Sequence, residues 1–407
     1  MHTSTTTSPE ALRAAMVERI RKAGHSQRSE VKRVLLGTPR HEFVPDADLA
    51  VAYDPWKAVV THRFDDGRSL SCASAPWLVA AMLDQLDVQP GNRILEIGAG
   101  TGYNASLLAQ LTGRADLVTT IDIDPDVTAK ASQALAATGY GDVHVITGDG
   151  GLGYPDHAPY DRMIATVSPW DIPAPWWQQL APGARLVAPL RWRGQGRSVS
   201  FTYTDGRLVS DSLHLCGFVY LRGETEGELS GSITADDMVK LHWDRDQAVD
   251  LKALDGVLDQ PRATAWSGVT IAPNEGHDGF WLRLTVTDQR VCRISAHPDA
   301  IPDVVTPIGG YWRPALVDGG SLVYLTARRL ETGDGVRWEL GAIGHGPAAA
   351  ELTEHLCDEA RTWSPERDHY EPRLVVYPAD TPDSELGGAV FEKTHSRFVF
   401  SYNSVSG

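Results

Sequence analysis

The 407-residue sequence has only four cysteines, and no two of them form a C-x-x-C pair. They occur singly, at Cys72, Cys216, Cys292 and Cys357. Small secreted domains held by disulfides need closely spaced cysteines, and zinc sites built on cysteine need close pairs. We therefore expect reduced thiols, as in a cytoplasmic protein, and we predict no metal site.

Long apolar runs are also missing, since none approaches the roughly 20 residues that a membrane-spanning helix needs. The N-terminus begins polar and then becomes amphipathic, without the apolar core of a signal peptide. These two absences predict a soluble protein of the cytoplasm.

An excess of basic residues is absent as well, because 37 Lys and Arg oppose 53 Asp and Glu and give a formal net charge of -16. Binding to nucleic acids and to anionic membranes normally depends on clustered Lys and Arg. The charges here are spread along the chain. Neither nucleic acid nor a membrane is therefore an expected partner.

The chain is longer than the roughly 100 to 200 residues of a typical domain, so we expect two domains. The segment 222–232 is short, polar and rich in Gly, Glu and Ser, which is typical of a connection between domains. We predict one domain over residues 1–222 and a smaller one over residues 233–407.

The first domain is predicted to alternate helices and strands. Ser8 followed by Pro9 is typical of a helix start, and a second helix is expected at 29–37. From residue 77 on, helical segments separate short apolar strands, which is the pattern of crossovers between parallel strands. We predict helices at 77–86, 104–111 and 127–139, and strands at 93–98, 117–123, 143–149, 160–167 and 184–190. The fold class is therefore α/β, with a Rossmann-like doubly wound sheet.

The second domain is predicted to be α+β with a mostly antiparallel sheet, because its strand-like runs are grouped together. These runs lie at 262–272, 279–286, 290–296, 321–330, 338–343, 372–379 and 396–404. One clear helix, at 348–363, stands among them.

The most informative motif is the run ILEIGAGTGYN, in which Glu96 is followed by Gly98, Gly100 and Gly102. Glycines let a backbone approach a bound nucleoside closely, because they lack a Cβ and accept positive φ. A dinucleotide fingerprint would need glycine where Tyr103 stands. The pattern E-x-G-x-G-x-G instead resembles the first motif of S-adenosylmethionine-dependent methyltransferases, which implies that cofactor. A glycine-rich turn of purely structural use is the alternative.

Two later strand ends carry residues suited to the same cofactor. Asp122 closes a strand 24 positions after Gly98, near the roughly 20-residue separation at which a carboxylate meets ribose hydroxyls in dinucleotide-binding folds. Gly148, Asp149 and Gly150 close the next strand. We expect Asp149 to accept from the adenine amine, while the glycines leave room for the ring.

The run DIDPD also suggests a calcium loop, because Asp122, Asp124 and Asp126 alternate. An EF-hand loop that starts at Asp122 needs Gly at its sixth position and Glu at its twelfth. Val127 and Gln133 stand at those positions. Calcium binding is therefore not predicted.

Several separated stretches point to one family by their order: VKRVLLGTPRHEFVP, AVAYDPW, SAPWLVAAML, LEIGAGTGYNASLLAQL, YDRMIATVS and QQLAPGARLVAPL. Together they resemble the protein-L-isoaspartate O-methyltransferase family over roughly residues 10–222. The resemblance implies transfer of the S-adenosylmethionine methyl group to a side-chain or isoaspartyl carboxylate of a peptide or protein. The longer chain is similar to extended forms of this family that modify ribosomal peptides.

By this resemblance, the serine of the Ser-Ala-Pro element contacts the acceptor carboxylate, and Ser74 stands in that position. Trp77 and Ser168 lie in the matching stretches and are added to the predicted substrate site. The alternative for Ser74 is an N-cap of the helix that follows. Ser69 and Ser71 offer competing hydroxyls.

Three functions remain open at this point. The favoured one is methylation of an aspartyl or isoaspartyl carboxylate in a modified ribosomal peptide, whose ester then closes to a succinimide. A general isoaspartyl repair enzyme is the second, and a catalytically lapsed cofactor-binding module is the third. Six tryptophans in 233–407 favour peptide capture, since aromatic residues recur at binding hot spots, although core packing is the alternative for each.

Overall fold

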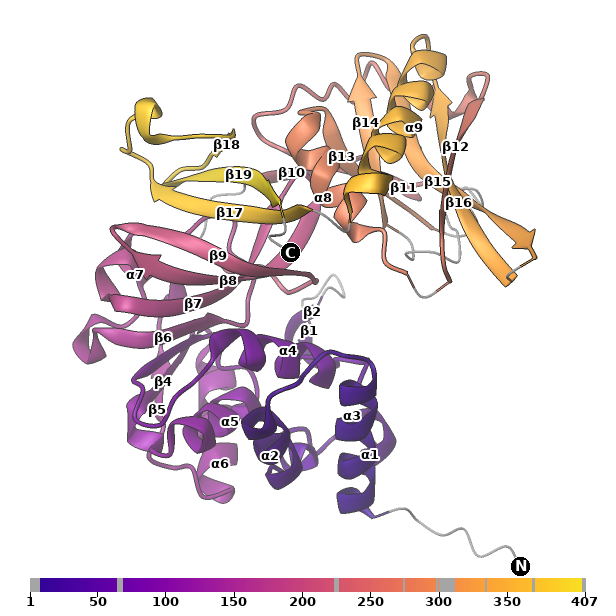
Figure 1. Ribbon diagram of the computed structural model, residues 1–407. Helices are drawn as coiled ribbons and strands as arrows, with labels where there is room; N and C mark the ends of the chain where they lie inside the picture. Colours follow the sequence, from indigo (N-terminus) through magenta and orange to yellow (C-terminus); the bar gives the residue numbers. More distant parts are fainter. Residues whose placement is uncertain are drawn as a thin grey trace, which may run out of the picture.

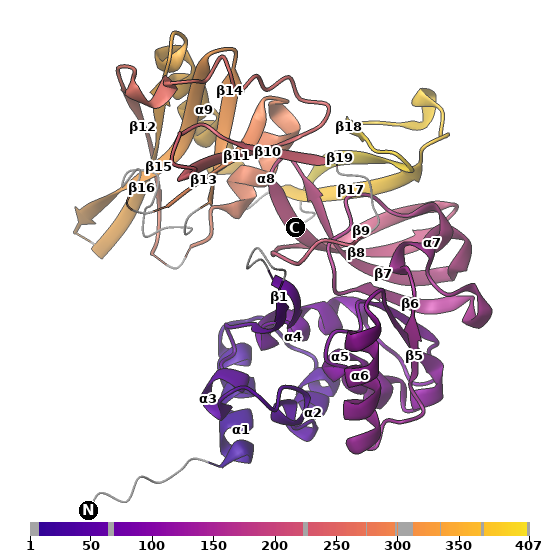
Figure 2. The ribbon, with the colours of Figure 1, turned by 180° about the vertical axis from the view of Figure 1, so that it is seen from behind.

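The computed structural model describes residues 8–63, 69–222, 227–273, 275–297, 299, 312–333, 335–367 and 370–404. Within these ranges the strands form a ten-stranded sheet, a seven-stranded sheet and a two-stranded hairpin. Figures 1 and 2 show that the N-terminal helices lie against one end of the larger sheet, while the smaller sheet stands beside its other end.

The N-terminal segment forms short helices, which confirms the two that were predicted there. They are α1 (Pro9–Lys22), α2 (Ser29–Gly37) and α3 (Leu49–Ala52), with the 3-10 turn η1 (Arg40–Phe43). Ser8 caps α1 by accepting a hydrogen bond from the Ala11 amide at 3.3 Å, which satisfies one of the free amides of the first turn. The serine-rich run is a strand, since β2 (Ser69–Ala73) pairs with β1 (Val59–Arg63).

The α/β prediction is confirmed by the larger sheet. Its parallel strands are β3 (Ile94–Ile97), β4 (Val118–Asp122), β5 (His144–Thr147), β6 (Tyr160–Ala165) and β7 (Leu180–Trp192). The connecting helices are α4 (Pro76–Leu86), α5 (Tyr103–Thr112), α6 (Pro125–Ala137) and α7 (Ala174–Gln179), with 3-10 turns η2 (Ala115–Leu117), η3 (Gly150–Leu152) and η4 (Pro155–His157). The strand order β7-β6-β3-β4-β5 brings the ends of β3, β4 and β6 together at one edge.

The central strand β3 is buried on both faces. Ile94 packs into a core built with α1, α2, α4 and α5. Leu95 and Ile97 point to the opposite core, which includes Trp176 of α7. This double burial explains why the strand is apolar except at Glu96.

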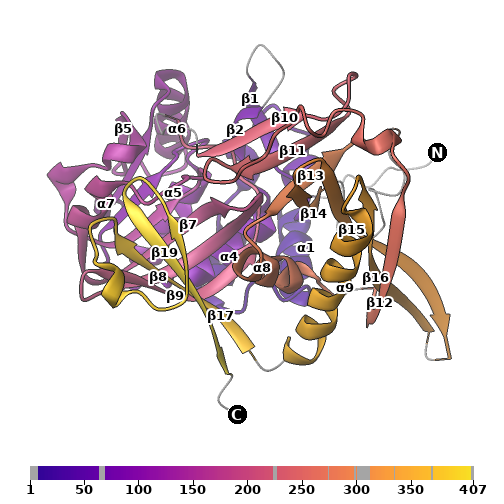
Figure 3. The same ribbon diagram turned by 90° about the horizontal axis from the view of Figure 1, so that it is seen from above.

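The sheet continues through antiparallel strands that come from both halves of the chain. They are β8 (Gln195–Thr204), β9 (Arg207–Leu215), β17 (Tyr370–Pro378), β18 (Ala389–Glu392) and β19 (Ser396–Ser404), with the 3-10 turn η6 (Asp383–Glu385). Figure 3 shows β17 and β19 running alongside β8 and β9.

The prediction of one separate domain over 233–407 is therefore wrong for residues 370–404. Val375 of β17 pairs with Val209 of β9. Leu374 and Phe398 are buried in the same core as Phe201 of β8. These strands cover an edge and an apolar face that the first part of the chain would otherwise leave exposed.

The seven-stranded sheet is antiparallel in every described pairing, which confirms the predicted class of the second unit. Its strands are β10 (Glu228–Ser232), β11 (Val239–Asp244), β12 (Ala263–Ile271), β13 (Val291–Ala296), β14 (Trp312–Asp318), β15 (Ser321–Thr332) and β16 (Gly335–His345). Its helices are α8 (Asp278–Thr287) and α9 (Ala349–Glu366), with the 3-10 turn η5 (Val257–Asp259).

The strand predicted at 279–286 is wrong, because this segment forms α8. Phe280 and Leu284 lie one helical turn apart and are both buried in a core shared with α9. Leu282, on another side of α8, joins the core of the larger sheet. A helix buried on two sides is apolar nearly all round, and its sequence therefore lacks the periodicity that identifies an amphipathic helix.

The β7–β8 turn and the start of β8 contact the second unit through two buried arginines, Arg193 and Arg197. The Arg193 amide donates to the Asp244 carboxylate at 3.0 Å, and the Arg193 guanidinium donates to Asp246 at 2.6 and 2.7 Å. The Arg197 guanidinium donates to Asp278 at 3.0 Å. Arg193 and Asp244 are buried on both sides of their contact, whereas Asp246 and Asp278 are partly exposed, and removing one partner of a buried ion pair is costly. These contacts therefore hold the second unit in a defined place against the larger sheet.

Three further observations concern membranes, metals and thiols. No helix in the described ranges is long and apolar enough to cross a membrane. Across the same ranges, no three His, Cys, Asp or Glu side chains are grouped as metal ligands. The four cysteines are free thiols, as predicted. Burial raises the pKa of Cys216 and of Cys292 to about 12, so both stay protonated at neutral pH.

We expect Phe398→Ala to destabilise the larger sheet, although Phe398 lies far from β3 in sequence. Its side chain is fully buried, and truncation of a buried phenylalanine costs about 3 to 5 kcal/mol. Urea unfolding followed by circular dichroism measures this loss. Val390→Ala, at an exposed position of the same hairpin, should cost less than about 1 kcal/mol. Equal losses for the two variants would contradict the assignment of β19 to this sheet.

Candidate active site

The glycine loop between β3 and α5 has no room for side chains at two positions. Gly98 has a φ of +97° and Gly102 a φ of +81°, which glycine adopts without strain. A Cβ on Gly98 would lie 2.5 Å from Oγ1 of Thr166, and one on Gly102 would lie 3.1 Å from the Ala131 carbonyl oxygen. The loop has glycine at these two positions because Thr166, which follows β6, and Ala131 of α6 occupy the space that side chains would need.

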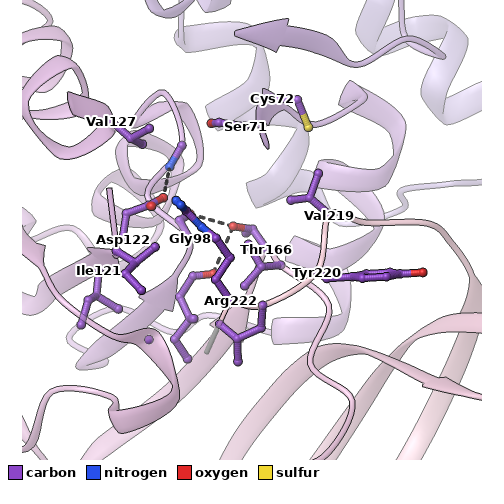
Figure 4. A pocket seen from close by; sticks show the side chains of 16 residues that line it. Ser71, Cys72, Gly98, Ile121, Asp122, Val127, Thr166, Val219, Tyr220 and Arg222 are labelled. Carbon is purple, nitrogen blue, oxygen red and sulfur yellow. Dashed lines mark hydrogen bonds between the residues drawn. The ribbon is translucent and has the colours of Figure 1, made fainter. Parts of the chain in front are cut away.

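One pocket opens where this loop meets the ends of β4 and β6, and we call it the strand-end pocket. Asp122 lies in its wall, and its carboxylate accepts hydrogen bonds from the amides of Gly100 at 3.3 Å and Asp124 at 3.2 Å. Burial raises the pKa of Asp122 above its usual value. Figure 4 shows Asp122, Thr166 and Arg222 gathered around this pocket. A carboxylate thus stands at the strand end where a ribose contact was predicted.

A second pocket lies against the same loop, and we call it the inner pocket. Cys72, Gly98, Gly100 and Thr166 line both pockets, so the two cavities adjoin. Ser74 lines the inner pocket. The glycine loop is therefore the wall between a strand-end cavity and a cavity that contains the predicted acceptor serine.

The inner pocket also contains a buried arginine. Arg40 donates from Nε to the Ala52 carbonyl at 3.0 Å, and from Nη2 to the carbonyls of Ala73 at 3.1 Å and Ser74 at 2.8 Å. Its Nη1 and the Tyr103 hydroxyl are both buried without a hydrogen-bond partner among the described residues. Burial raises the pKa of Tyr103 to about 12, so its hydroxyl remains a donor. Both residues line the inner pocket, and an anion bound there would give the two buried donors a partner.

Glu96 also lines the inner pocket, and both of its carboxylate oxygens accept hydrogen bonds. Oε1 accepts from Asn104 Nδ2 at 2.8 Å, and Oε2 accepts from Thr120 Oγ1 at 2.7 Å. Burial raises the pKa of Glu96 to about 7, and the nearby charge of Asp122 acts in the same direction. The structure therefore shows Glu96 holding α5 and β4 to β3, and its predicted contact with the cofactor stays a prediction.

The Gly-Asp-Gly run lies only partly in the strand-end pocket. Gly150 lines this pocket, and a Cβ there would lie 2.5 Å from Cγ2 of Ile97. Asp149 accepts from the Gly151 amide at 2.8 Å and lines a neighbouring cavity. A Cβ on Gly148 would lie 3.3 Å from Ile121 Cδ1. The adenine roles of Asp149 and Gly148 stay predictions.

The comparison with protein families bears directly on this site. Residues 11–226 match the family described as Protein-L-isoaspartate(D-aspartate) O-methyltransferase (PCMT), which is more than half of the chain. The chain belongs to this family. The S-adenosylmethionine-dependent methyltransferase class predicted from the sequence is thereby confirmed.

Curated relatives cover the same region. The chain is 38% identical over 221 residues to the protein-L-isoaspartate O-methyltransferase of Hyperthermus butylicus, which spans 52% of this chain and 89% of that protein. It is 37% identical over 214 residues to the Methanopyrus kandleri enzyme of the same name, over 52% and 92%. A solved protein-L-isoaspartate O-methyltransferase is similar with a TM-score of 0.48 and 19% identity, over 96% of this chain and 99% of that one.

The strand-end pocket fits the S-adenosylmethionine of this methyltransferase family. Glycines at 98, 100 and 150 keep its walls open, and a Cβ on Gly98 or Gly150 would meet a neighbour at 2.5 Å. The Asp122 carboxylate lies in its wall, where ribose hydroxyls need an acceptor. These residues would hold the cofactor beside the inner pocket.

Two predicted methyltransferase substrate residues lie away from both pockets. The Ser168 hydroxyl is buried and donates to the Pro189 carbonyl at 2.6 Å, and its predicted substrate contact stays a prediction. Trp77 packs against His25, with ring centres 4.7 Å apart, and it is not part of either lining. Local sequence could not show which way these side chains turn.

The capping alternative for Ser74 is also wrong. The N-cap of α4 is Ala75, and no side chain makes a capping hydrogen bond there. Ser74 is half-buried and lies in the inner pocket. The structure is therefore compatible with the substrate role, which stays a prediction.

Three pocket residues of this methyltransferase were missed by the sequence analysis: Arg40, Thr166 and Arg222. Thr166 follows directly after β6, so the strand-end rule that selected Asp122 could have found it. Arg40 lies in the TPRHEFVP stretch, which indicated the family but not the burial of the side chain. Arg222 was assigned to the connection between domains.

We expect Gly98→Ala to weaken cofactor binding at least about tenfold, because crowding and a left-handed backbone each cost about 1 to 3 kcal/mol. Calorimetric titration with S-adenosylhomocysteine measures the affinity. Gly113→Ala is the matched control, since Gly113 has a φ of +77° but no atom within 4 Å of a Cβ. It should lose stability but keep its affinity. Unchanged affinity in a folded Gly98→Ala variant would contradict the assigned pocket.

Proposed function

We propose that this chain transfers the methyl group of S-adenosylmethionine to an aspartyl or isoaspartyl carboxylate of a peptide. The observation that carries the proposal is the pair of adjoining pockets that share Cys72, Gly98, Gly100 and Thr166. The strand-end pocket is suited to the cofactor and the inner pocket to an anionic acceptor. A methyl donor and a carboxylate would therefore meet where the two pockets adjoin, beside these four shared residues.

The inner pocket has the donors that a carboxylate needs. Arg40 is fully buried, and its described hydrogen bonds all go to backbone carbonyls. A buried guanidinium is costly without a negative partner. Arg40, Tyr103 and Ser74 line the same cavity, and Arg40 Nη1 and the Tyr103 hydroxyl are buried without a hydrogen-bond partner among the described residues. A bound carboxylate would satisfy these groups.

The chemistry requires little beyond positioning. A carboxyl group with an ordinary pKa near ~4 is already ionised at neutral pH, so no general base is needed. The bound cofactor supplies an electrophilic methyl group on a sulfonium centre. Ser74 and Arg40 would orient one acceptor oxygen, and alignment of reactants with exclusion of water can lower a barrier by roughly 7 to 11 kcal/mol.

The finer part of the proposal is that the acceptor belongs to a modified ribosomal peptide. The family match ends at residue 226, and the seven-stranded sheet lies beyond it. Trp243, Trp281 and Trp363 are buried in that unit, whereas Trp312 is exposed. Most of these tryptophans therefore build a core, and one is available for a partner.

Methylation prepares the carboxyl group for ring closure. In the ester, the next backbone nitrogen attacks the carbonyl carbon, a C–N bond forms, and the C–O bond to the methoxy group breaks. The nitrogen proton leaves with the methoxy group as methanol, and a succinimide remains. The enzyme needs only to form the ester, because the free carboxylate is a much poorer electrophile.

General repair of isoaspartyl proteins is the second candidate function. It is favoured by the curated relatives, since the matched region spans 89% and 92% of two proteins named protein-L-isoaspartate O-methyltransferase. The second unit is then an addition to a complete catalytic domain. The two candidates differ in how strongly the enzyme selects its peptide.

A comparison of three peptides tests the proposal: a ring-bearing peptide encoded beside this protein, a linear isoaspartyl peptide and a linear aspartyl peptide. With labelled S-adenosylmethionine, we expect a kcat/KM at least about tenfold higher for the ring-bearing peptide, equal to about 1.4 kcal/mol of transition-state stabilisation. Efficient turnover of arbitrary isoaspartyl peptides would instead support repair. Absence of transfer to every peptide would leave a cofactor-binding module.

Ser74→Ala tests the predicted acceptor site in the same assay. A hydrogen bond to a charged group contributes about 1.5 to 3 kcal/mol, so the rate should fall roughly ten- to a hundredfold. The affinity for S-adenosylhomocysteine should not change. An unchanged rate would remove Ser74 from the acceptor site.

A further inference from the structure

Five side chains form a continuous surface between the strand-end pocket and the seven-stranded sheet: Arg191, Tyr220, Glu228, Arg293 and Trp312. We call it the Tyr220–Trp312 surface. Its two rings are 52% and 53% exposed, which is unusual for side chains of this size. Tyr220 lines the strand-end pocket, whereas Trp312 lines neither pocket, so the cofactor and acceptor sites do not explain the exposure of Trp312.

Each of the five side chains contacts at least one of the others. The Arg191 guanidinium lies 3.6 Å from the centre of the Tyr220 ring, and the Arg293 guanidinium lies 5.0 Å from that of Trp312. The Tyr220 hydroxyl donates to Glu228 at 2.7 Å. The same carboxylate lies 3.6 Å from Arg191 and 3.8 Å from Arg293. Each ring therefore has a cation on one face and remains accessible elsewhere.

The surface begins at the active site and ends in the added unit. Tyr220 lines the strand-end pocket. Trp312 opens β14, and a Cβ on Gly217 would lie 3.8 Å from its ring, so Trp312 lies close to the segment that leads to Tyr220. Glu228, Arg293 and Trp312 all follow residue 226, where the family match ends. This surface is therefore a feature of the extended chain.

The charge of the surface selects the kind of partner. The Arg191 and Arg293 side chains are each 12% exposed, and their two positive charges are opposed within the surface by the one carboxylate of Glu228. The patch is thus locally positive in a chain with a formal net charge of -16. Arg222, in the lining of the adjoining pocket, is paired with Asp124 at 3.6 Å and does not add to this charge. Carboxylates are the preferred partners of guanidinium groups, and exposed Trp and Tyr rings supply contact area at low entropy cost.

We propose that the Tyr220–Trp312 surface binds an acidic segment of the same peptide whose carboxylate is methylated. The proposal rests on the proposed function, because it assumes a peptide acceptor in the inner pocket. The acidic segment lies along Arg191 and Arg293 while the acceptor residue occupies the inner pocket. The surface then determines which peptide is captured, and the catalytic step itself does not involve it.

Two synthetic peptides of equal length test this surface. Both contain one isoaspartyl residue, and its flanking residues are Glu in one peptide and Gln in the other. We expect the wild-type KM to be about tenfold lower for the Glu peptide, as expected for charge contacts at an interface. In Trp312→Ala and in Arg293→Gln this preference should fall to about twofold or less, with kcat retained. Trp56→Ala, at a ring 41% exposed near the N-terminal helices, is the matched control and should keep the preference.

The assay separates failure of this inference from failure of the proposed function. Methyl transfer to the Gln peptide supports the proposed function whatever the surface does. Equal KM values of the wild type for the two peptides, or an unchanged preference in both surface variants, would overturn the inference. If neither peptide is methylated, the proposed function fails, and fluorescence anisotropy with the labelled Glu peptide still decides the surface. Tighter binding by the wild type than by Trp312→Ala then supports it, and equal binding overturns it.

Discussion

The contact between Thr166 and Gly98 determines where the rest of the active site can lie. The Thr166 hydroxyl donates to the Gly98 carbonyl at 2.7 Å and occupies the space that a Cβ on Gly98 would need. The loop therefore packs closely against the end of β6 and against α6, and it forms part of the lining of both pockets. The two pockets adjoin at Cys72, Gly98, Gly100 and Thr166, so the proposed cofactor and acceptor sites lie side by side. Catalysis by positioning depends on that short separation.

The same sheet that holds the loop also holds the added part of the chain. Strands β17 to β19 extend it from the C-terminus, while Arg193 in the β7–β8 turn donates to Asp244 of β11 and Arg197 of β8 donates to Asp278 of α8. The second unit is thus inserted between strands of one sheet and fixed against it by shielded ion pairs. This arrangement places Trp312 next to the segment that lines the strand-end pocket. A domain on a flexible linker would not keep such a surface in a fixed position relative to the active site.

The α/β unit and its cofactor loop could be predicted because their signals are local. The run ILEIGAG contains the strand, the turn and the glycines that the turn requires, and Asp122 follows the next strand by the same rule. The C-terminal strands were assigned to the wrong unit because β17 pairs with a strand more than 150 residues away, and nothing local specifies that partner. Helix α8 was missed because burial on two sides removes its periodicity. Arg40 and Ser168 show the remaining limit, since the direction of a side chain depends on packing that only the tertiary structure supplies.

The central claim is that the product is a carboxyl methyl ester, and the stability of the transferred label tests it most directly. The peptide is methylated with S-adenosylmethionine that carries a labelled methyl group, and the product is then made alkaline. Methyl esters hydrolyse in base, whereas methyl groups on nitrogen or carbon do not. The account predicts that the label is released as volatile methanol, and that Ser74→Ala lowers its yield. A label that remains on the peptide after alkaline treatment would contradict carboxyl methylation.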